Sequence, residues 1–121
     1  MDKKQILVVE NDTALSGVIV NILEIHGLEG SAVETGEETL NLLKETKYHF
    51  IILDLSLPDT TGIELYKKIV KSYPAYKGRV TFCSGHSISA ELAQIMKEDQ
   101  LFFLPKPFSL DKFKEIIQKW N

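Results

Sequence analysis

The stretch "IILDLSLPDTTG", residues 51–62, places an aspartate at the end of an apolar run. Residues 50–54, "FIILD", are nearly all hydrophobic, as a strand buried on both faces of a parallel sheet must be. Asp54 therefore lies beside a buried sheet, where most chains carry a neutral residue. An isolated aspartate after a strand is most often a turn or cap residue, so the rest of the chain has to decide its role.

The hydrophobic pattern of the chain predicts an α/β fold. Short aliphatic runs alternate with stretches of helical spacing, and this alternation implies parallel strands joined by crossover helices in a (βα)5 sandwich. The second helix is predicted over 36–46 and the fourth over 88–98, where Ile88 begins an apolar face. The five predicted strands are "QILVVE" (5–10), the more polar edge run "EGSAV" (29–33), "FIILD" (50–54), "RVTFC" (79–83) and "LFFL" (101–104).

Length and composition indicate an ordinary globular protein. The 121 residues predict one domain, 1–121, in which Gly27, Pro74 and Ser109 mark helix ends. A net charge of -3 with interspersed signs gives no basic footprint for nucleic acid and no polybasic membrane patch. No apolar run is long enough to span a membrane and no signal peptide is recognisable, so a cytoplasmic location is expected. The single cysteine, Cys83, is expected in the core.

The residues just past each strand are the candidates for function, because ligands of open parallel sheets bind beyond the carboxyl ends of the strands. Carboxylates, an amide, a hydroxyl and an ammonium are predicted to meet there: Glu10, Asn11, Asp12, Asp54, Ser84 and Lys106. Each alone has an ordinary alternative as a turn residue, a helix cap or a surface lysine. Their joint occurrence at four strand ends is hard to obtain by chance.

Electrostatics indicates what this cluster needs. Neighbouring strands lie about 4.8 Å apart, so Glu10 and Asp54 would repel each other and raise a pKa unless a cation intervenes. Lys106 supplies one positive charge, and an oxygen-only cluster also suits a hard divalent ion, above all Mg²⁺ with several retained waters. Asp54 is thus a candidate metal ligand and nucleophile.

Four motifs together resemble the receiver domain of bacterial two-component response regulators, over essentially the whole chain. They are "ILVVEND", "IILDLSLPDTTGIEL", "VTFCSG" and "FLPKPF". The resemblance implies a flavodoxin-like, doubly wound sheet of five parallel strands in the order 2-1-3-4-5. It also implies a histidine kinase or phosphotransfer protein as partner. The stretches "VTFCSGH" and "LPKPFSLDKF" look most like receivers fused to hybrid histidine kinases, so both a stand-alone receiver and a fused one stay open.

The resemblance implies a role for each site residue. Asp54 would accept a phosphoryl group, Lys106 would pair with the phosphoryl oxygens, and the Ser84 hydroxyl would hydrogen-bond to them. A phosphorylated side chain carries about -1.5 to -2 charges, so such a site needs donors and cations. Mg²⁺ would bridge the carboxylate and the phosphoryl group. Its implied ligands are Glu10, Asn11, Asp54 and the backbone carbonyl of Ser56.

Further positions match features of the same family. Lys106-Pro107 is expected to be a cis peptide, and Gly85 is small, as phosphoryl access requires. Phe103 occupies the aromatic switch position, whose ring turns inward as the hydroxyl of Ser84 moves toward the phosphate. The fourth helix, fifth strand and fifth helix are therefore expected to form the signalling face, which is also a candidate homodimer interface.

The residue after Glu10 departs from the family pattern. Two acids are usual there, whereas this chain has the neutral Asn11, so Mg²⁺ should bind more weakly. Asp12 either compensates through a water or serves only as a helix cap. Two functions stay open: a phosphorylatable receiver, or a degenerate receiver that acts as a phosphorylation-independent protein interaction module.

The histidines and the remaining acids bear on competing functions. His86, two residues past Ser84, either orients water or hydrogen-bonds to the phosphoryl group, or it is a plain exposed loop histidine. A flavodoxin is disfavoured because "ENDTALSG" would repel phosphate, and a haloacid-type phosphatase because Ser56 stands where its second Asp would be. Catalysis is expected to be limited to self-phosphorylation and self-dephosphorylation of Asp54.

Overall fold

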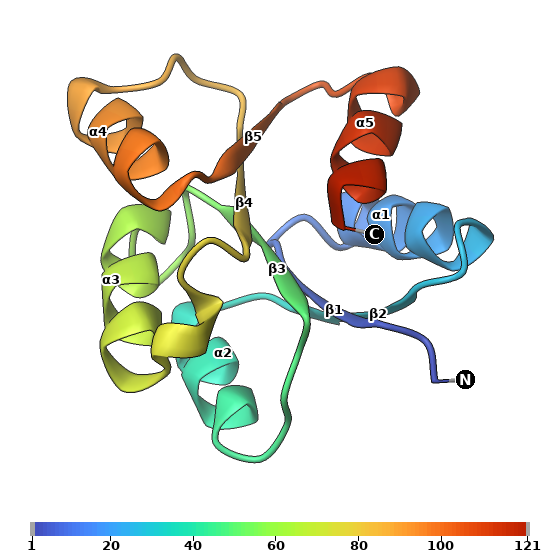
Figure 1. The fold of residues 1–121 in the computed structure, drawn as a ribbon, viewed down its shortest axis with the longest axis horizontal. Helices are drawn as coiled ribbons and strands as arrows, with labels where there is room; N and C mark the ends of the chain where they lie inside the picture. Colours follow the sequence, from blue (N-terminus) through green and yellow to red (C-terminus); the bar gives the residue numbers. More distant parts are fainter. Residues whose placement is uncertain (1, 121) are drawn as a thin grey trace.

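The computed structural model describes residues 2–120, in which strands alternate with helices around one parallel sheet (Figure 1). The sheet order is β2-β1-β3-β4-β5, which confirms the predicted doubly wound topology with "EGSAV" at an edge. No helix in residues 2–120 combines the length and apolar content needed to cross a bilayer. The elements in chain order are β1 (Gln5–Val9), α1 (Thr13–Ile25), β2 (Glu29–Val33), α2 (Gly36–Leu43), β3 (Phe50–Asp54), α3 (Gly62–Ser72), the 3-10 helix η1 (Pro74–Tyr76), β4 (Val80–Ser84), α4 (Ala90–Asp99), β5 (Phe102–Pro105) and α5 (Leu110–Trp120).

Helices cover both faces of the sheet. α1 and α5 lie on one face, and α2, α3 and α4 lie on the other (Figure 1). Side chains alternate along each strand, so Ile6 and Val8 of β1 pack into the core shared with α1 and α5, whereas Leu7 and Val9 pack into the opposite core. Cys83 is buried in the first of these cores, as predicted, and burial raises the pKa of its thiol to about 12.

Local chemistry sets the helix ends. Gly27 follows α1 with a φ of 80°, a conformation that favours glycine, and Pro74 begins η1 after Tyr73, the C-cap of α3. Before α5, the Ser109 hydroxyl accepts the Lys112 N–H at 3.1 Å. All three residues therefore act at helix boundaries, as their positions in the sequence predict.

Two helices and three strands differ from their predicted bounds. α2 ends at Leu43 instead of residue 46, because the next turn closes with tighter i→i+3 bonds. α4 begins at Ala90 instead of residue 88, because the Ser89 hydroxyl caps its first turn, and Ile88 precedes the helix with 44% of its surface exposed. β1 ends one residue earlier than predicted, and β4 and β5 each lie one residue later, as the ladder between these two strands requires.

A polar contact joins α3 to the last turn of α4. The Tyr66 hydroxyl donates to Asp99 Oδ2 at 2.6 Å, and Lys77 Nζ lies 3.7 Å from Asp99 Oδ1. A carboxylate at a helix C-terminus opposes the helix dipole, so these partners offset an unfavourable placement. The Tyr66 ring also packs edge-on against Phe82, with 5.5 Å between ring centroids. Burial and the neighbouring carboxylate raise the pKa of the Tyr66 hydroxyl, which keeps it a donor.

The Tyr66 hydroxyl should therefore stabilise the packing of α3 against α4. We expect Tyr66→Phe to lower the free energy of unfolding by about 1.5 to 3 kcal/mol, because it keeps the ring but leaves a largely buried carboxylate short of a donor. Urea unfolding measures the loss. In an Asp99→Ala background the same substitution should cost much less, and an equal cost in both backgrounds would contradict this assignment.

Candidate functional site

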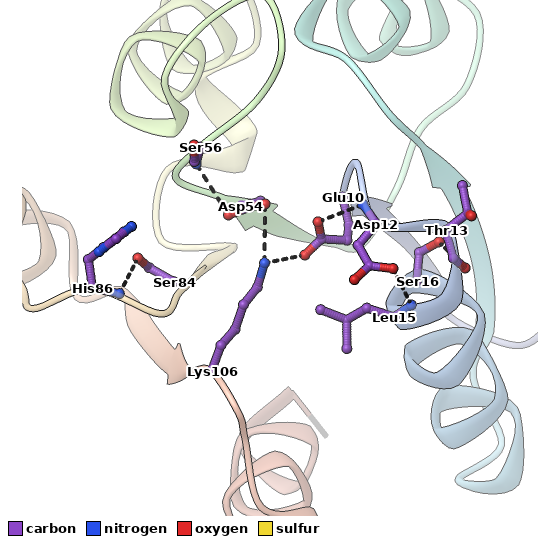
Figure 2. A network of polar contacts seen from close by, with 10 residues as sticks. All are labelled: Glu10, Asp12, Thr13, Leu15, Ser16, Asp54, Ser56, Ser84, His86 and Lys106. Atoms are coloured by element: carbon purple, nitrogen blue, oxygen red, sulfur yellow. Dashed lines mark hydrogen bonds and ion pairs between the residues drawn. The ribbon is translucent and has the colours of Figure 1, made fainter.

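Three strands bring charged side chains to one edge of the sheet. Glu10 follows β1, Asp54 ends β3, and Lys106 follows β5. Backbone hydrogen bonds between neighbouring strands continue past the strand ends. The Glu10 N–H donates to Val33 O at 3.0 Å, and the Lys106 N–H donates to Ser84 O at 2.8 Å. The three side chains thus start from a firmly held backbone, and they point toward one another (Figure 2).

Lys106 lies between two buried carboxylates. Its Nζ is 2.5 Å from Glu10 Oε1 and 3.2 Å from Asp54 Oδ2. The Glu10 and Asp54 side chains are 4% and 8% exposed, whereas that of Lys106 is 23% exposed. The ammonium therefore offsets the repulsion that the order of the strands creates between the two acids.

Backbone N–H groups hold the other two carboxylate oxygens. The Asp12 N–H donates to Glu10 Oε2 at 3.0 Å, and the Ser56 N–H donates to Asp54 Oδ1 at 3.2 Å. Each of the four oxygens therefore has a partner, and both side chains are fixed in orientation. Asp12 itself caps α1, since its Oδ1 accepts the Leu15 N–H at 3.1 Å, so the helix-cap reading of Asp12 is the one seen here.

The electrostatic balance of the site remains negative. Burial raises the pKa of the Asp54 carboxyl and Glu10 raises it further, while the Ser56 N–H and Lys106 lower it. Burial alone would lower the pKa of the Lys106 ammonium, but the two carboxylates raise it overall. Two carboxylates share one ammonium, so a further cation would find an excess negative charge.

The chemistry of the donors fits a hard cation such as Mg²⁺. The carboxylates of Glu10 and Asp54, the carbonyl of Ser56 and the amide of Asn11 all offer oxygen, which is the ligand type that Mg²⁺ prefers. Asn11 is exposed in the bend after β1. Within residues 2–120, no three acidic, histidine or cysteine side chains converge on one point. A metal ion here would therefore depend on two carboxylates, with neutral oxygens and water completing its shell.

The hydroxyl of Ser84 is engaged within its own loop. Its Oγ accepts the His86 N–H at 3.0 Å, and both residues lie to one side of Lys106 (Figure 2). A Cβ built on Gly85 would lie 3.8 Å from Lys106 Cβ, an ordinary van der Waals contact, so Gly85 borders the Lys106 side chain. The His86 side chain is exposed.

Two further features derived from the sequence can be placed in the structure. The Lys106-Pro107 peptide is cis, as expected. Phe103 is half-buried and packs against the core on the α3 and α4 side of the sheet.

The anchoring of the loop after Asp54 was not anticipated from the sequence. The Asp59 carboxylate accepts the N–H groups of Gly36 and Glu37 at 2.9 and 3.0 Å, which ties the loop to the start of α2. The sequence marks only the two helix starts: "TGEE" (35–38) and "TGIE" (61–64) each place a threonine cap, a glycine and a glutamate at the start of α2 and α3. No local pattern marks the bonds from α2 to Asp59.

Comparison with known proteins identifies the family. The family model of the response regulator receiver domain matches residues 6–118. The chain belongs to this family. Chemotaxis protein CheY of Thermotoga maritima is 26% identical over 117 residues, which cover 96% of each chain. The DNA-binding transcriptional regulator NtrC of Proteus hauseri is 25% identical over 119 residues, which cover 98% of this chain.

A solved relative was captured with a metal. The response regulator TrrA of Thermotoga maritima, determined in complex with Mg²⁺-BeF, superposes with a TM-score of 0.83 at 25% identity, over 98% of this receiver domain and 99% of that chain. Three other curated relatives are longer, and the present chain spans 25%, 55% and 62% of their length. The comparisons thus establish a receiver domain, while the activity of those longer proteins is a separate matter.

The ion pairs of Lys106 lead to a stability test. We expect Lys106→Met to lower the free energy of unfolding near pH 7 by on the order of 3 kcal/mol, because it leaves two buried carboxylates face to face. The pKa of Asp54 is raised in the folded state, so the folded state binds a proton more tightly than the unfolded chain does. The free energy of unfolding therefore falls as the pH rises from the unfolded pKa of Asp54 to its folded pKa. Removing Lys106 raises that pKa further.

The loss of stability should therefore be smaller at about pH 5 than at about pH 7. Urea unfolding at both values measures it, and Asp54→Asn in the Lys106→Met background serves as the control. The double variant should recover most of the loss, since one of the facing charges is gone. A loss independent of pH, or no recovery, would contradict the electrostatic explanation.

Proposed function

We propose that this receiver domain accepts a phosphoryl group on Asp54 from a phosphorylated histidine of a kinase or phosphotransfer protein. The observation that carries the proposal is the Asp54 carboxylate, buried at the sheet edge within 3.2 Å of the Lys106 ammonium. An Asp54 oxygen attacks phosphorus, the bond from phosphorus to the donor imidazole nitrogen breaks, and an acyl phosphate forms. Catalysis by the chain itself is limited to this self-phosphorylation and to the later hydrolysis.

The residues around Asp54 favour the transfer electrostatically. Lys106 pairs with the Asp54 carboxylate before transfer and would pair with the phosphoryl oxygens afterwards. Those oxygens require cationic or hydrogen-bond-donating partners. Ser56 fixes one Asp54 oxygen through its N–H, so the carboxylate enters the reaction already oriented. A bound Mg²⁺ would be held by Glu10, Asp54 and the Ser56 carbonyl, and it would neutralise charge on the transferring group.

Ser84 and Phe103 form the proposed switch. After transfer, the Ser84 hydroxyl leaves the His86 N–H and donates to a phosphoryl oxygen, and the half-buried Phe103 ring moves inward. A ligand can only shift an equilibrium between packings that already exist, so phosphorylation acts by favouring one of them. The face of α4, β5 and α5 is the proposed surface for a downstream partner or a second copy, in a cytoplasmic protein with or without a fused kinase.

The proposal is tested by direct phosphorylation. We expect incubation with acetyl phosphate and Mg²⁺ to add the mass of one phosphoryl group to the intact protein. Asp54→Asn should add none, and chelation of Mg²⁺ should abolish the gain. If the wild-type chain gains no mass under these conditions, the proposal is contradicted. The phosphorylation-independent interaction module is then the better hypothesis.

Asn11 should limit metal binding. We expect Asn11→Asp to tighten Mg²⁺ binding at least roughly tenfold, because an added unit charge about 4 Å from a divalent ion contributes on the order of 2 kcal/mol even in water. Isothermal titration of the metal measures the change. Asn21→Asp, on the exposed side of α1, is the matched control for added charge and should leave the affinity nearly unchanged.

A further inference from the structure

The loop that follows Asp54 is attached to the N-terminus of a helix distant in sequence. Asp59 accepts the Gly36 N–H at Oδ1 and the Glu37 N–H at Oδ2, at 2.9 and 3.0 Å. These N–H groups belong to the first turn of α2, which has no partner for them within the helix. The two bonds lower the pKa of the Asp59 carboxyl, so it stays ionised at neutral pH and suits the positive end of the helix dipole.

Close packing at Gly36 accompanies these bonds. A Cβ built on Gly36 would lie 2.6 Å from Thr60 Cγ2 and 3.5 Å from Asp59 Oδ2. Gly36 is buried, so the absence of a side chain is what lets the loop approach α2 this closely. The contact between loop and helix therefore rests on two separate features, one polar and one steric.

The loop itself has few degrees of freedom between Asp54 and α3. The Leu57 N–H donates to Thr60 O at 3.2 Å, and the Gly62 N–H donates to Leu55 O at 2.9 Å. A movement of Asp59 is thus transmitted backward along a closed turn. The segment that it reaches contains Ser56, whose N–H orients Asp54 and whose carbonyl is a candidate metal ligand.

We propose that Asp59 is a positioning residue: its two bonds to α2 hold the turn that presents the Ser56 peptide to Asp54. This inference rests on the proposed function, because the site served by Ser56 is the phosphorylation site. In this role Asp59 acts through the Ser56 peptide and would not itself touch the phosphoryl group or a metal ion. A plain structural role, in which Asp59 only stabilises the start of α2, is the competing explanation.

Thr35 provides a matched control for that explanation. Its hydroxyl caps the same helix by accepting the Glu38 N–H at 3.1 Å, and it belongs to no part of the loop after Asp54. Thr35→Ala should destabilise α2 by about 1 kcal/mol, as loss of a cap does. Asp59→Ala removes capping and also releases the loop, so only the second variant should disturb Ser56.

Two readouts decide between the explanations. Amide hydrogen exchange in the metal-free protein should quicken at Ser56 and Leu57 in Asp59→Ala and stay near wild type in Thr35→Ala. The Kd for Mg²⁺, measured by calorimetry, should rise about tenfold or more in Asp59→Ala only, as loss of an outer-shell partner does. Asp59→Asn keeps one acceptor oxygen and should fall between wild type and Asp59→Ala.

A steric variant tests the same contact without removing any hydrogen-bonding group. Gly36→Ala improves the intrinsic helix propensity of α2, yet its methyl group would press on Thr60 Cγ2. We expect it to quicken exchange at Ser56, and we expect Thr60→Ser, which deletes that methyl, to restore slow exchange in the double variant. If the contact served only to stabilise α2, Gly36→Ala would instead slow amide exchange at Ser56.

Several outcomes would overturn the proposal. The proposal fails if Asp59→Ala and Thr35→Ala have equal effects on both readouts. It also fails if Asp59→Ala leaves exchange at Ser56 or the Kd for Mg²⁺ unchanged, or if the wild-type chain binds no Mg²⁺. A wild-type chain that binds Mg²⁺ but takes no phosphoryl group would defeat the proposed function alone, since the comparison of Asp59 with Thr35 needs only exchange and metal binding.

Discussion

The pairing of Lys106 with Glu10 and Asp54 is the interaction on which the organisation of the sheet edge depends. Parallel strands place their carboxyl ends at one edge, so acids that follow β1 and β3 are forced together whatever their function. Burial makes this juxtaposition costly unless a cation lies between them. Lys106 can supply that cation because its backbone is held on β4 by the bond to Ser84 O.

The rest of the fold serves to keep these three side chains in place. The two cores fix the strands from both faces, and N–H groups at the start of the following segments orient the carboxylates. The loop after Asp54 is held by hydrogen bonds from the start of α2, which lies in a helix layer beside the sheet. The charged side chains proposed to take part in phosphoryl transfer thus lie at strand ends, while the adjoining loops carry the groups that would respond to a new negative charge.

Much of this arrangement follows from local sequence. The hydrophobic runs predict the strands and distinguish the buried strands from the edge strand. The site residues end or follow those runs, as Asp54 does. Other features depend on tertiary contacts that no local pattern encodes. Asp59 and Gly36 are far apart in the chain, and so are Tyr66 and Asp99, so neither contact has a periodic signal. The end of α2 at Leu43 reflects a competition between similar backbone bonds that propensity cannot resolve.

The burial of Cys83 has a practical consequence. The chain holds a single thiol, and it lies beside Asp54 where β3 pairs with β4. Burial raises the pKa of this thiol to about 12, which leaves almost no thiolate at neutral pH. An alkylating reagent therefore has nothing to react with until the centre of the sheet opens. The rate of labelling would report the opening of this central part of the molecule without any engineered probe, in the free and the modified chain alike.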